Sequence, residues 1–299
     1  MSKFDEIFNG SRKQREDVSI PPFDRDEWIQ QKKAEREKAF ELIDQAAEVM
    51  VMDGDRLKTY LDLQSRFPRF SVGNILLLSI QTPDATRIAD FKSWKETGAF
   101  IRRGETGILL LEPGNSYKKE DGSHGISYNT KRVFDITQTT AEPKPVQTVN
   151  RDIRLLLRAL VYNAPCEIKV DGSIPIPDNM AAIYDPAHCT IYVARGQGGP
   201  LLFKEIAREL AHAHIDLGDY NREECEFAAL CTSYIICRRY NVDVSSFSFT
   251  ELPESFRALD AKGVRRELGK MRSTAINIET DMDKHFEKQM EKAGPDEAR

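Results

Sequence analysis

Apolar positions recur at three- and four-residue steps over several long stretches of the chain, and this spacing predicts amphipathic helices. Within residues 26–52, for example, the side chains of Phe40, Ile43, Ala47 and Met50 fall on one face. Glycine and proline separate the stretches from one another. The predicted helices are 26–52, 55–67, a third that begins after the capping residue Ser71, 150–162, 201–216, 223–240 and 263–292.

Short runs of β-branched and aromatic residues predict strands between these helices. The run 106–111 ends at Pro113-Gly114, and we expect residues 114–127 to form a polar loop or hairpin tip before a strand at 127–137. Three shorter strands are predicted at 166–170, 181–184 and 190–194. The fold class is therefore α+β, with a helical and small-sheet N-terminal domain, a second α+β domain, and helical N- and C-terminal extensions.

Proline-rich and charged segments suggest where the chain divides. Pro21-Pro22 closes a charged N-terminal segment, and Pro143 and Pro145 punctuate the middle of the chain. The predicted units are a flexible arm at 1–25, a first domain at 26–140, a linker at 141–149, a second domain at 150–245 and a helical tail at 246–299.

The composition of the 299 residues, with 40% apolar and 30% charged, is that of a globular protein. No apolar run approaches the roughly 20 residues of a membrane span, and the charged N-terminus lacks the apolar core of a signal peptide. Five cysteines without a CxxC pair argue against a disulfide scaffold. We therefore expect a cytoplasmic protein that does not bind membranes.

The net charge of -5 excludes a uniformly basic binder, but the charge is uneven along the chain. Residues 54–140 contain 13 Lys/Arg against 10 Asp/Glu, and aromatic residues are frequent there. Single-stranded nucleic acid needs cations for its backbone and aromatic faces for its bases. Candidate stacking residues are Phe70, Trp94, Phe100 and Tyr128, although Trp94 and Phe100 could instead be core residues. The predicted nucleic-acid-binding residues are Arg66, Arg69, Lys92, Trp94, Lys95, Arg102, Arg103, Lys131 and Arg132, of which Arg102 and Arg103 precede a turn glycine and should be exposed.

The predicted helix 201–216 has two distinct faces. His214 falls with the apolar residues Phe203, Ile206, Ala207 and Leu210, which indicates a core histidine. The opposite face is either a solvated surface or a chemical site. It contains Glu205, Glu209, His212 and Asp216.

The segment from Arg208 to His212 reads Arg-Glu-Leu-Ala-His, which differs at its first residue from the His-Glu-x-x-His motif of zinc metalloproteases. In that motif two histidines bind zinc and the glutamate polarises the bound water. Arginine keeps its proton and has no lone pair for a metal. We therefore predict no metal, no cofactor and no catalytic residues, with Glu209 and His212 as remnants of a catalytic site. Whether the protein is an enzyme is left open, and the arginine in the motif favours a protein without enzyme activity.

The second half resembles the zincin-like domain of the ImmA/IrrE and ArdC group in Ala181–Pro186, Thr190–Val193, Lys204–Ala213 and Ser233–Arg239. The resemblance implies a histidine at Arg208 and a glutamate ligand at Ala228 or Leu230, so that two of three ligands are lost. Glu223, Glu224 and Glu226 lie one turn earlier, where the register argues against them. We expect Arg208 to lie near Glu205, Glu209 or the segment Glu223–Glu226, and Arg208→His alone not to restore tight zinc binding.

The first half resembles the N-terminal domain of ArdC proteins in Phe67–Leu78, Trp94–Gly98, Arg102–Ile108 and Val133–Thr139. This resemblance implies a protein of a conjugative or other mobile element that binds single-stranded DNA and acts in antirestriction. A restriction or conjugation protein is a further possible partner.

Two alternatives remain beside this leading hypothesis. The first is an active metalloprotease whose non-standard ligands come from Glu205, Glu209, His212, Asp216 or Glu223–Glu226. The second is a protein-interaction module that does not bind DNA.

Overall fold

A computed structural model describes residues 24–119, 121–142, 152–170, 176 and 180–293. The predicted arm, up to residue 23, lies outside the described residues. So do Pro143 and Pro145 of the predicted linker, and the domain boundary at 141–149 therefore stays a prediction.

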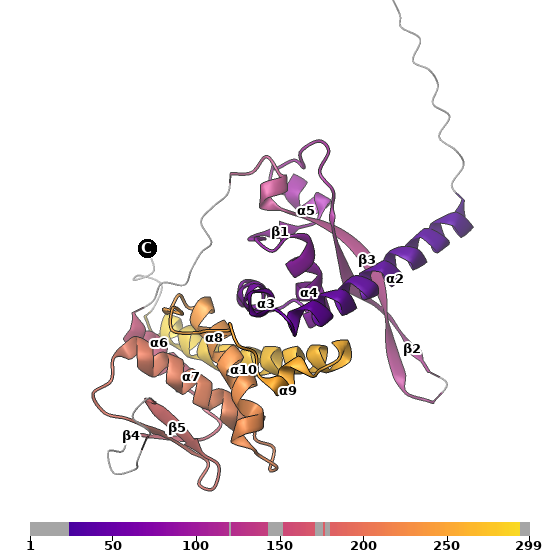
Figure 1. Cartoon of the computed structure of the whole chain (residues 1–299). Coiled ribbons are helices and arrows are strands. Elements are labelled where there is room, and N and C mark those ends of the chain that lie inside the picture. Colours follow the sequence, from indigo (N-terminus) through magenta and orange to yellow (C-terminus); the bar gives the residue numbers. More distant parts are fainter. Residues whose placement is uncertain (1–23, 120, 143–151, 171–175, 177–179, 294–299) are drawn as a thin grey trace, which may run out of the picture.

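Four α-helices, a short 3-10 helix and a three-stranded antiparallel sheet form the described N-terminal half (Figure 1). The sheet has the strand order β1-β3-β2, and carboxylate or hydroxyl side chains cap four of the helices by accepting first-turn N–H groups. The elements are α2 (Arg25–Met50), α3 (Gly54–Arg66), α4 (Val72–Gln81), β1 (Ile88–Ala89), α5 (Phe91–Glu96), β2 (Ile108–Lys118), β3 (His124–Asp135) and the short helix η1 (Ile136–Gln138).

Strand β2 is longer than the sequence predicted, because it continues through Pro113-Gly114 to Lys118. The expected loop at 114–127 is therefore largely strand. Proline is tolerated here because β2 is an edge strand and because the register with β3 shifts between Pro113 and Ser116.

Helix α2 buries Ile43, Ala47 and Met50 as predicted, but Phe40 is exposed. The ring of Phe40 meets Tyr128 of β3 edge to face, with 6.1 Å between the centroids. Ala39 occupies the buried position instead.

The C-terminal half combines a mixed sheet with four larger helices. In the sheet order β4-β6-β5, β4 runs parallel and β5 antiparallel to the central strand β6. Helix α7 begins with Pro200 in its first turn and packs against β5. The elements are α6 (Ile153–Leu160), β4 (Glu167–Val170), β5 (Ala182–Asp185), β6 (Thr190–Val193), α7 (Gly199–Ile215), α8 (Arg222–Arg239), α9 (Glu254–Arg257) and α10 (Ala261–Ala293).

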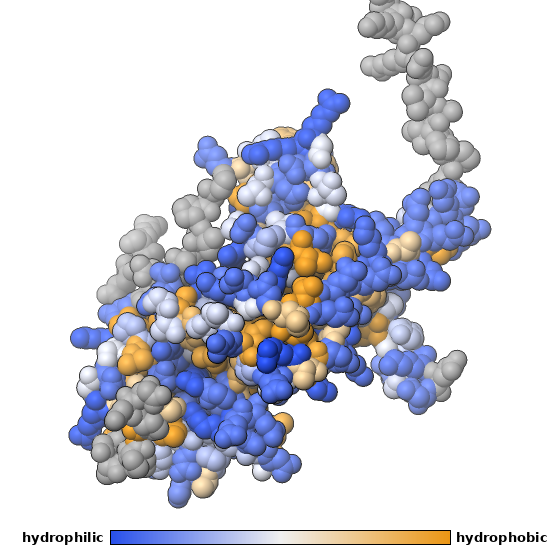
Figure 2. Space-filling model, in the orientation of Figure 1, coloured by the Kyte–Doolittle hydropathy of each residue, from blue (hydrophilic) through white to orange (hydrophobic). Residues whose placement is uncertain are grey.

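One hydrophobic core runs through both halves. Helix α3 packs on α8, where the Tyr234 hydroxyl and the Arg238 guanidinium both donate to Asp62 Oδ1 at 2.8 and 2.7 Å. Helix α10 contacts α2 and α4 as well as α6, α7 and α8, so the predicted C-terminal tail is a central element of the fold (Figure 1). On the face seen in Figure 2, apolar residues gather over the middle of the molecule. No helix among the described residues has the length and apolar character needed to span a bilayer.

Candidate functional site

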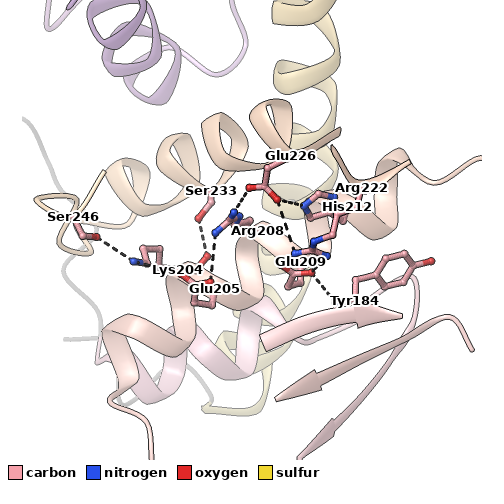
Figure 3. A network of polar contacts seen from close by, with 10 residues as sticks. All are labelled: Tyr184, Lys204, Glu205, Arg208, Glu209, His212, Arg222, Glu226, Ser233 and Ser246. Carbon is pink, nitrogen blue, oxygen red and sulfur yellow. Dashed lines mark hydrogen bonds and ion pairs between the residues drawn. The ribbon is translucent and has the colours of Figure 1, made fainter. Parts of the chain in front are cut away.

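Helices α7 and α8 enclose a cluster of charged side chains, which Figure 3 shows from close by. One face of α7 presents Glu205, Arg208, Glu209 and His212, because residues three and four apart lie above one another on a helix. Glu205, Glu209 and His212 are buried, so this face is not a solvated surface. Helix α8 and the preceding turn add Tyr220, Arg222 and Glu226.

Glu226 lies at the centre of this cluster and binds two residues of α7. One carboxylate oxygen accepts a hydrogen bond from the Arg208 guanidinium, and the other lies 3.2 Å from His212 Nε2. Burial alone would raise the pKa of Glu226, but the hydrogen bond from His212 and the charge of Arg208 together lower it. Glu226 is therefore a carboxylate and can only accept, so Nε2 of His212 bears a proton.

The second nitrogen of His212 is also engaged. Its Nδ1 atom lies 3.0 Å from the hydroxyl oxygen of Tyr220, and burial raises the pKa of Tyr220 to about 12. The tyrosine therefore keeps its proton at neutral pH and can donate it to Nδ1. With a proton on Nε2 and a donor at Nδ1, neither nitrogen of the imidazole has a free lone pair.

Glu209, at the general-base position of the motif, is fully buried, and both of its oxygens accept hydrogen bonds. Arg222 binds it with both terminal nitrogens at 2.9 and 2.6 Å, and the backbone N–H of Tyr184 in β5 donates to it at 2.7 Å. Burial opposes the charge on Arg222, yet Glu209 raises the pKa of this guanidinium above its ordinary value. Such a bidentate pair holds both oxygens of Glu209 and stabilises its ionised form, which opposes the uptake of a proton from water.

The residues of the α7–α8 cluster do not fit a catalytic metal ion. A catalytic zinc needs about three protein ligands and an open position. Arg208 has no lone pair to give a metal, and its guanidinium already binds the carboxylate of Glu226. No group of three or more His, Cys, Asp or Glu side chains among the described residues is placed to hold a metal.

A second surface feature surrounds α5 in the N-terminal half. Phe91 and Phe100 are 59% and 60% exposed, and the side chains of Lys92, Lys95, Arg102 and Arg103 are exposed between and beside them. Gly104 has φ +89, so the chain turns directly after Arg103. We call this set, from Phe91 to Arg103, the α5 surface.

Residues 36–159 match the family model of the N-terminal domain of the anti-restriction factor ArdC. This segment belongs to that family. The match runs from α2 into α6, so that it includes the whole N-terminal sheet and the α5 surface.

Two further comparisons extend beyond the ArdC N-terminal domain. The chain is 22% identical over 280 residues to the uncharacterized protein pXO2-81 of Bacillus anthracis, covering 75% of this chain and 47% of that protein. It thus spans about half the length of the curated relative it matches. The metal-free and Mn(II)-bound crystal structures of the antirestriction protein ArdC from plasmid R388 align with TM-scores of 0.47 and 0.48, both at 15% identity. They cover 71% and 70% of this chain, and 85% and 84% of the ArdC chains.

The predicted nucleic-acid residues of the ArdC N-terminal domain fall into two groups. Arg69, Lys92, Lys95, Arg102 and Arg103 are exposed, and the exposure expected for Arg102 and Arg103 is confirmed.

Each member of the other group is engaged by contacts within the protein. Trp94 is only 1% exposed and donates its Nε1–H to the Phe134 carbonyl, so its proposed role as a stacking platform is wrong. The Arg66 guanidinium binds the Ala85 carbonyl at 2.9 Å. Lys131 pairs with Asp90 at 3.0 Å, and Arg132 pairs with Glu35 at 3.2 Å. The sequence reasoning missed Phe91, although its position directly before Lys92 follows the same basic-aromatic pattern.

Expectations for the α7–α8 cluster were met in part. The pairing of Arg208 with a nearby carboxylate is confirmed by Glu226, with Glu205 also 3.8 Å away. The ligand position that the resemblance implied at Ala228 or Leu230 stays a prediction; in the structure Ala228 is buried in the core whereas Glu226 faces α7. His214 is half-buried, and this burial lowers its pKa.

Proposed function

We propose that this protein binds single-stranded DNA through the α5 surface and that its C-terminal half is a zincin-like domain without peptidase activity. The anti-restriction description of the matched family supports a role of this kind against a restriction system, in a mobile element. The observation that carries the proposal is the exposure of two aromatic rings and several cations on the α5 surface.

The α5 surface has the two kinds of group that single-strand binding requires. Phe91 and Phe100 offer ring faces on which any base can stack. Among the described residues, Lys95, Arg102 and Arg103 form no ion pair, so their charges are available to phosphates. Neither kind of contact reads sequence, and we expect binding without base preference.

The test is a salt titration of oligonucleotide binding with the full chain. Arg102→Ala combined with Arg103→Ala should weaken binding about 10-fold at low salt and reduce the slope of log K against log salt by roughly 1.4, because two phosphate contacts are lost. The charge-matched control is Lys33→Ala with Lys38→Ala, two exposed lysines on α2. Absence of binding at low salt, or equal effects of the two pairs, would contradict the proposal and favour a protein-interaction module.

Three contacts support the non-catalytic assignment of the zincin-like half. Arg208 stands at a ligand position and binds Glu226, His212 has both nitrogens engaged, and Glu209 is held by Arg222. The guanidinium of Arg208 provides the positive charge beside Glu226 that a metal ion would otherwise provide. We therefore expect protein purified without chelators to contain no stoichiometric zinc and to cleave no peptide. About one zinc per chain would favour the metalloprotease alternative.

A further inference from the structure

A cavity of about 360 Å³ opens beside the α5 surface, between α4, α5 and the three strands of the N-terminal sheet. Ile88, Leu110 and Val133 contribute apolar walls, and Phe70, in the turn between α3 and α4, contributes an aromatic one. The volume lies near the lower end of the range of about 300–1,000 Å³ for small-molecule sites. We call this cavity the Phe70 pocket.

Polar groups of the Phe70 pocket are arranged as a donor beside an acceptor. Asp90 accepts from the Ser93 N–H at 2.8 Å and pairs with Lys131 at 3.0 Å, and the hydrogen bonds from Ser93 contribute most to lowering its pKa to about 2. Asp90 thus stays ionised with both oxygens engaged, and it holds the Lys131 ammonium in the pocket wall. Glu112 lies 3.8 Å from Lys131, and its side chain is 48% exposed. The remaining protons of Lys131 and the oxygens of Glu112 are therefore available to a ligand.

The aromatic wall of the pocket is fixed in place. Phe70 is stacked on Phe67, with 5.3 Å between centroids and 23° between the ring planes. Arg272 of α10 donates to the backbone carbonyls of Phe70 and Arg69 at 2.6 and 3.3 Å. A ring held this firmly loses little conformational freedom when a planar ligand stacks on it.

Two exposed cations, one of them on the α5 surface, border this pocket. Arg69 is the chain neighbour of Phe70, and Lys92 lies between the lining residues Asp90 and Ser93; the side chains of both are exposed. A strand whose phosphates contact Arg69 and Lys92 would pass over the pocket mouth. Every nucleobase has a flat apolar face and an edge with donors next to acceptors, which matches the ring and the Lys131–Glu112 pair.

We propose that the Phe70 pocket takes one unstacked nucleobase of the bound single strand. This inference rests on the proposed function, because the strand must first be held by the cations of the surface. The affinity of the protein for a single strand then depends on the bases of the strand as well as on its phosphates.

The experiment compares two ligands of equal phosphate number, an ordinary oligonucleotide of about 12 nucleotides and its fully abasic counterpart. The test variant is Ser93→Phe, which fills the pocket from α5 without changing charge; the control is Ser123→Phe at the exposed hairpin tip. We expect Ser93→Phe to weaken binding of the ordinary oligonucleotide about 10-fold and to leave binding of the abasic one unchanged, and the control to alter neither.

A second variant, Phe70→Leu, keeps the apolar volume but removes the ring, and should produce a smaller loss on the ordinary oligonucleotide only. Circular dichroism verifies that each variant is folded. If both pocket variants bind the ordinary oligonucleotide as the unmodified protein does, or lose affinity equally for both ligands, the pocket does not take a base. If the unmodified protein binds neither ligand at low salt, the proposed DNA binding itself is wrong.

Discussion

At the scale of single residues, Arg208 determines what the α7–α8 cluster can bind. Its guanidinium contacts Glu226 and lies 3.8 Å from Glu205, so a fixed positive charge lies beside carboxylates that a metal ion would otherwise attract. His212 and Glu226 nevertheless lie within 3.2 Å of each other. One substitution therefore separates this cluster from a set of three ligands.

We predict that Arg208→His enables the protein to bind zinc. The substitution removes the cation that competes for Glu226 and places an imidazole one helical turn from His212, as in a His-x-x-x-His pair. This prediction differs from the expectation from sequence, because Glu226 lies 3.2 Å from His212 and offers a third ligand. Metal analysis after dialysis should find about one zinc per chain in the variant. Adding Glu226→Ala should abolish this binding, and Arg103→His on the exposed α5 surface should not produce it.

We also predict that the zinc-loaded Arg208→His variant cleaves no peptide, because Glu209 remains paired with Arg222 and the Tyr184 N–H. Releasing Glu209 would require a further change, Arg222→Ala, which leaves a buried carboxylate unpaired and should destabilise the fold by about 3 kcal/mol. Peptidase activity in the single variant would show that this pairing does not restrain Glu209.

The site residues were only partly accessible from the sequence. The spacing of the motif identifies Arg208, Glu209 and His212, since these share one helix. Glu226 was included in the segment Glu223–Glu226 expected near Arg208, but its register, judged relative to Tyr234, argued against a role as a ligand. In the structure Tyr234 points to Asp62 of α3, and no pattern within α8 alone reveals that contact.

At the scale of elements, Asp135 connects three segments of the N-terminal sheet. Its Oδ1 atom accepts from the backbone N–H groups of Thr86 and Arg87, and Oδ2 accepts from the N–H and hydroxyl of Thr137. It thus caps η1 and holds the segment leading into β1, which borders the Phe70 pocket.

We predict that Asp135→Asn lowers the free energy of unfolding by about 2–3 kcal/mol, because an amide cannot accept at both atoms and its NH2 group would face buried donors. Denaturant unfolding monitored by circular dichroism measures this. The matched control is Asp121→Asn at the exposed hairpin tip, where the carboxylate also accepts from its neighbour Ser123 and a change within about 0.5 kcal/mol is expected. Equal losses in the two variants would contradict a special role for Asp135.

Element types were easier to predict than element ends. Helices α2, α3, α7, α8 and α10 followed from helix-favouring stretches and the breaks between them, with apolar spacing used for α2 and α7. The length of β2 did not, since Pro113-Gly114 indicates a turn unless the strand is known to be at a sheet edge.

At the scale of the whole molecule, α10 joins the two halves into one core. Val264, Leu268, Met271 and Met282 are fully buried along it, and it contacts helices from both halves. The sequence predicts this helix but not its central position, because an apolar stripe indicates that a helix packs without indicating on what.

Glu279 lies on α10 and is the buried carboxyl group that makes this packing sensitive to pH. Its Oε1 atom has no hydrogen-bond partner among the described residues, and burial raises its pKa to about 7, with Arg239 opposing and Asp283 adding to the shift. The folded state therefore binds this proton more tightly than the unfolded state, in which the pKa is about 4.5. The stability that this group contributes is fully present below about pH 4.5 and is lost as pH rises through about 7.

We predict that Glu279→Gln stabilises the protein at pH 8, by up to about 3 kcal/mol, and has little effect at pH 4.5. Glutamine is isosteric with the protonated acid and never ionises, so the difference between variant and unmodified protein isolates this one group from all other titrations. Denaturant unfolding at several pH values measures it, with Glu287→Gln on the exposed side of α10 as the control of equal charge. If the stability curves of the Glu279→Gln variant and the unmodified protein run parallel from pH 4.5 to 8, the buried carboxyl of Glu279 does not set the pH response of the shared core.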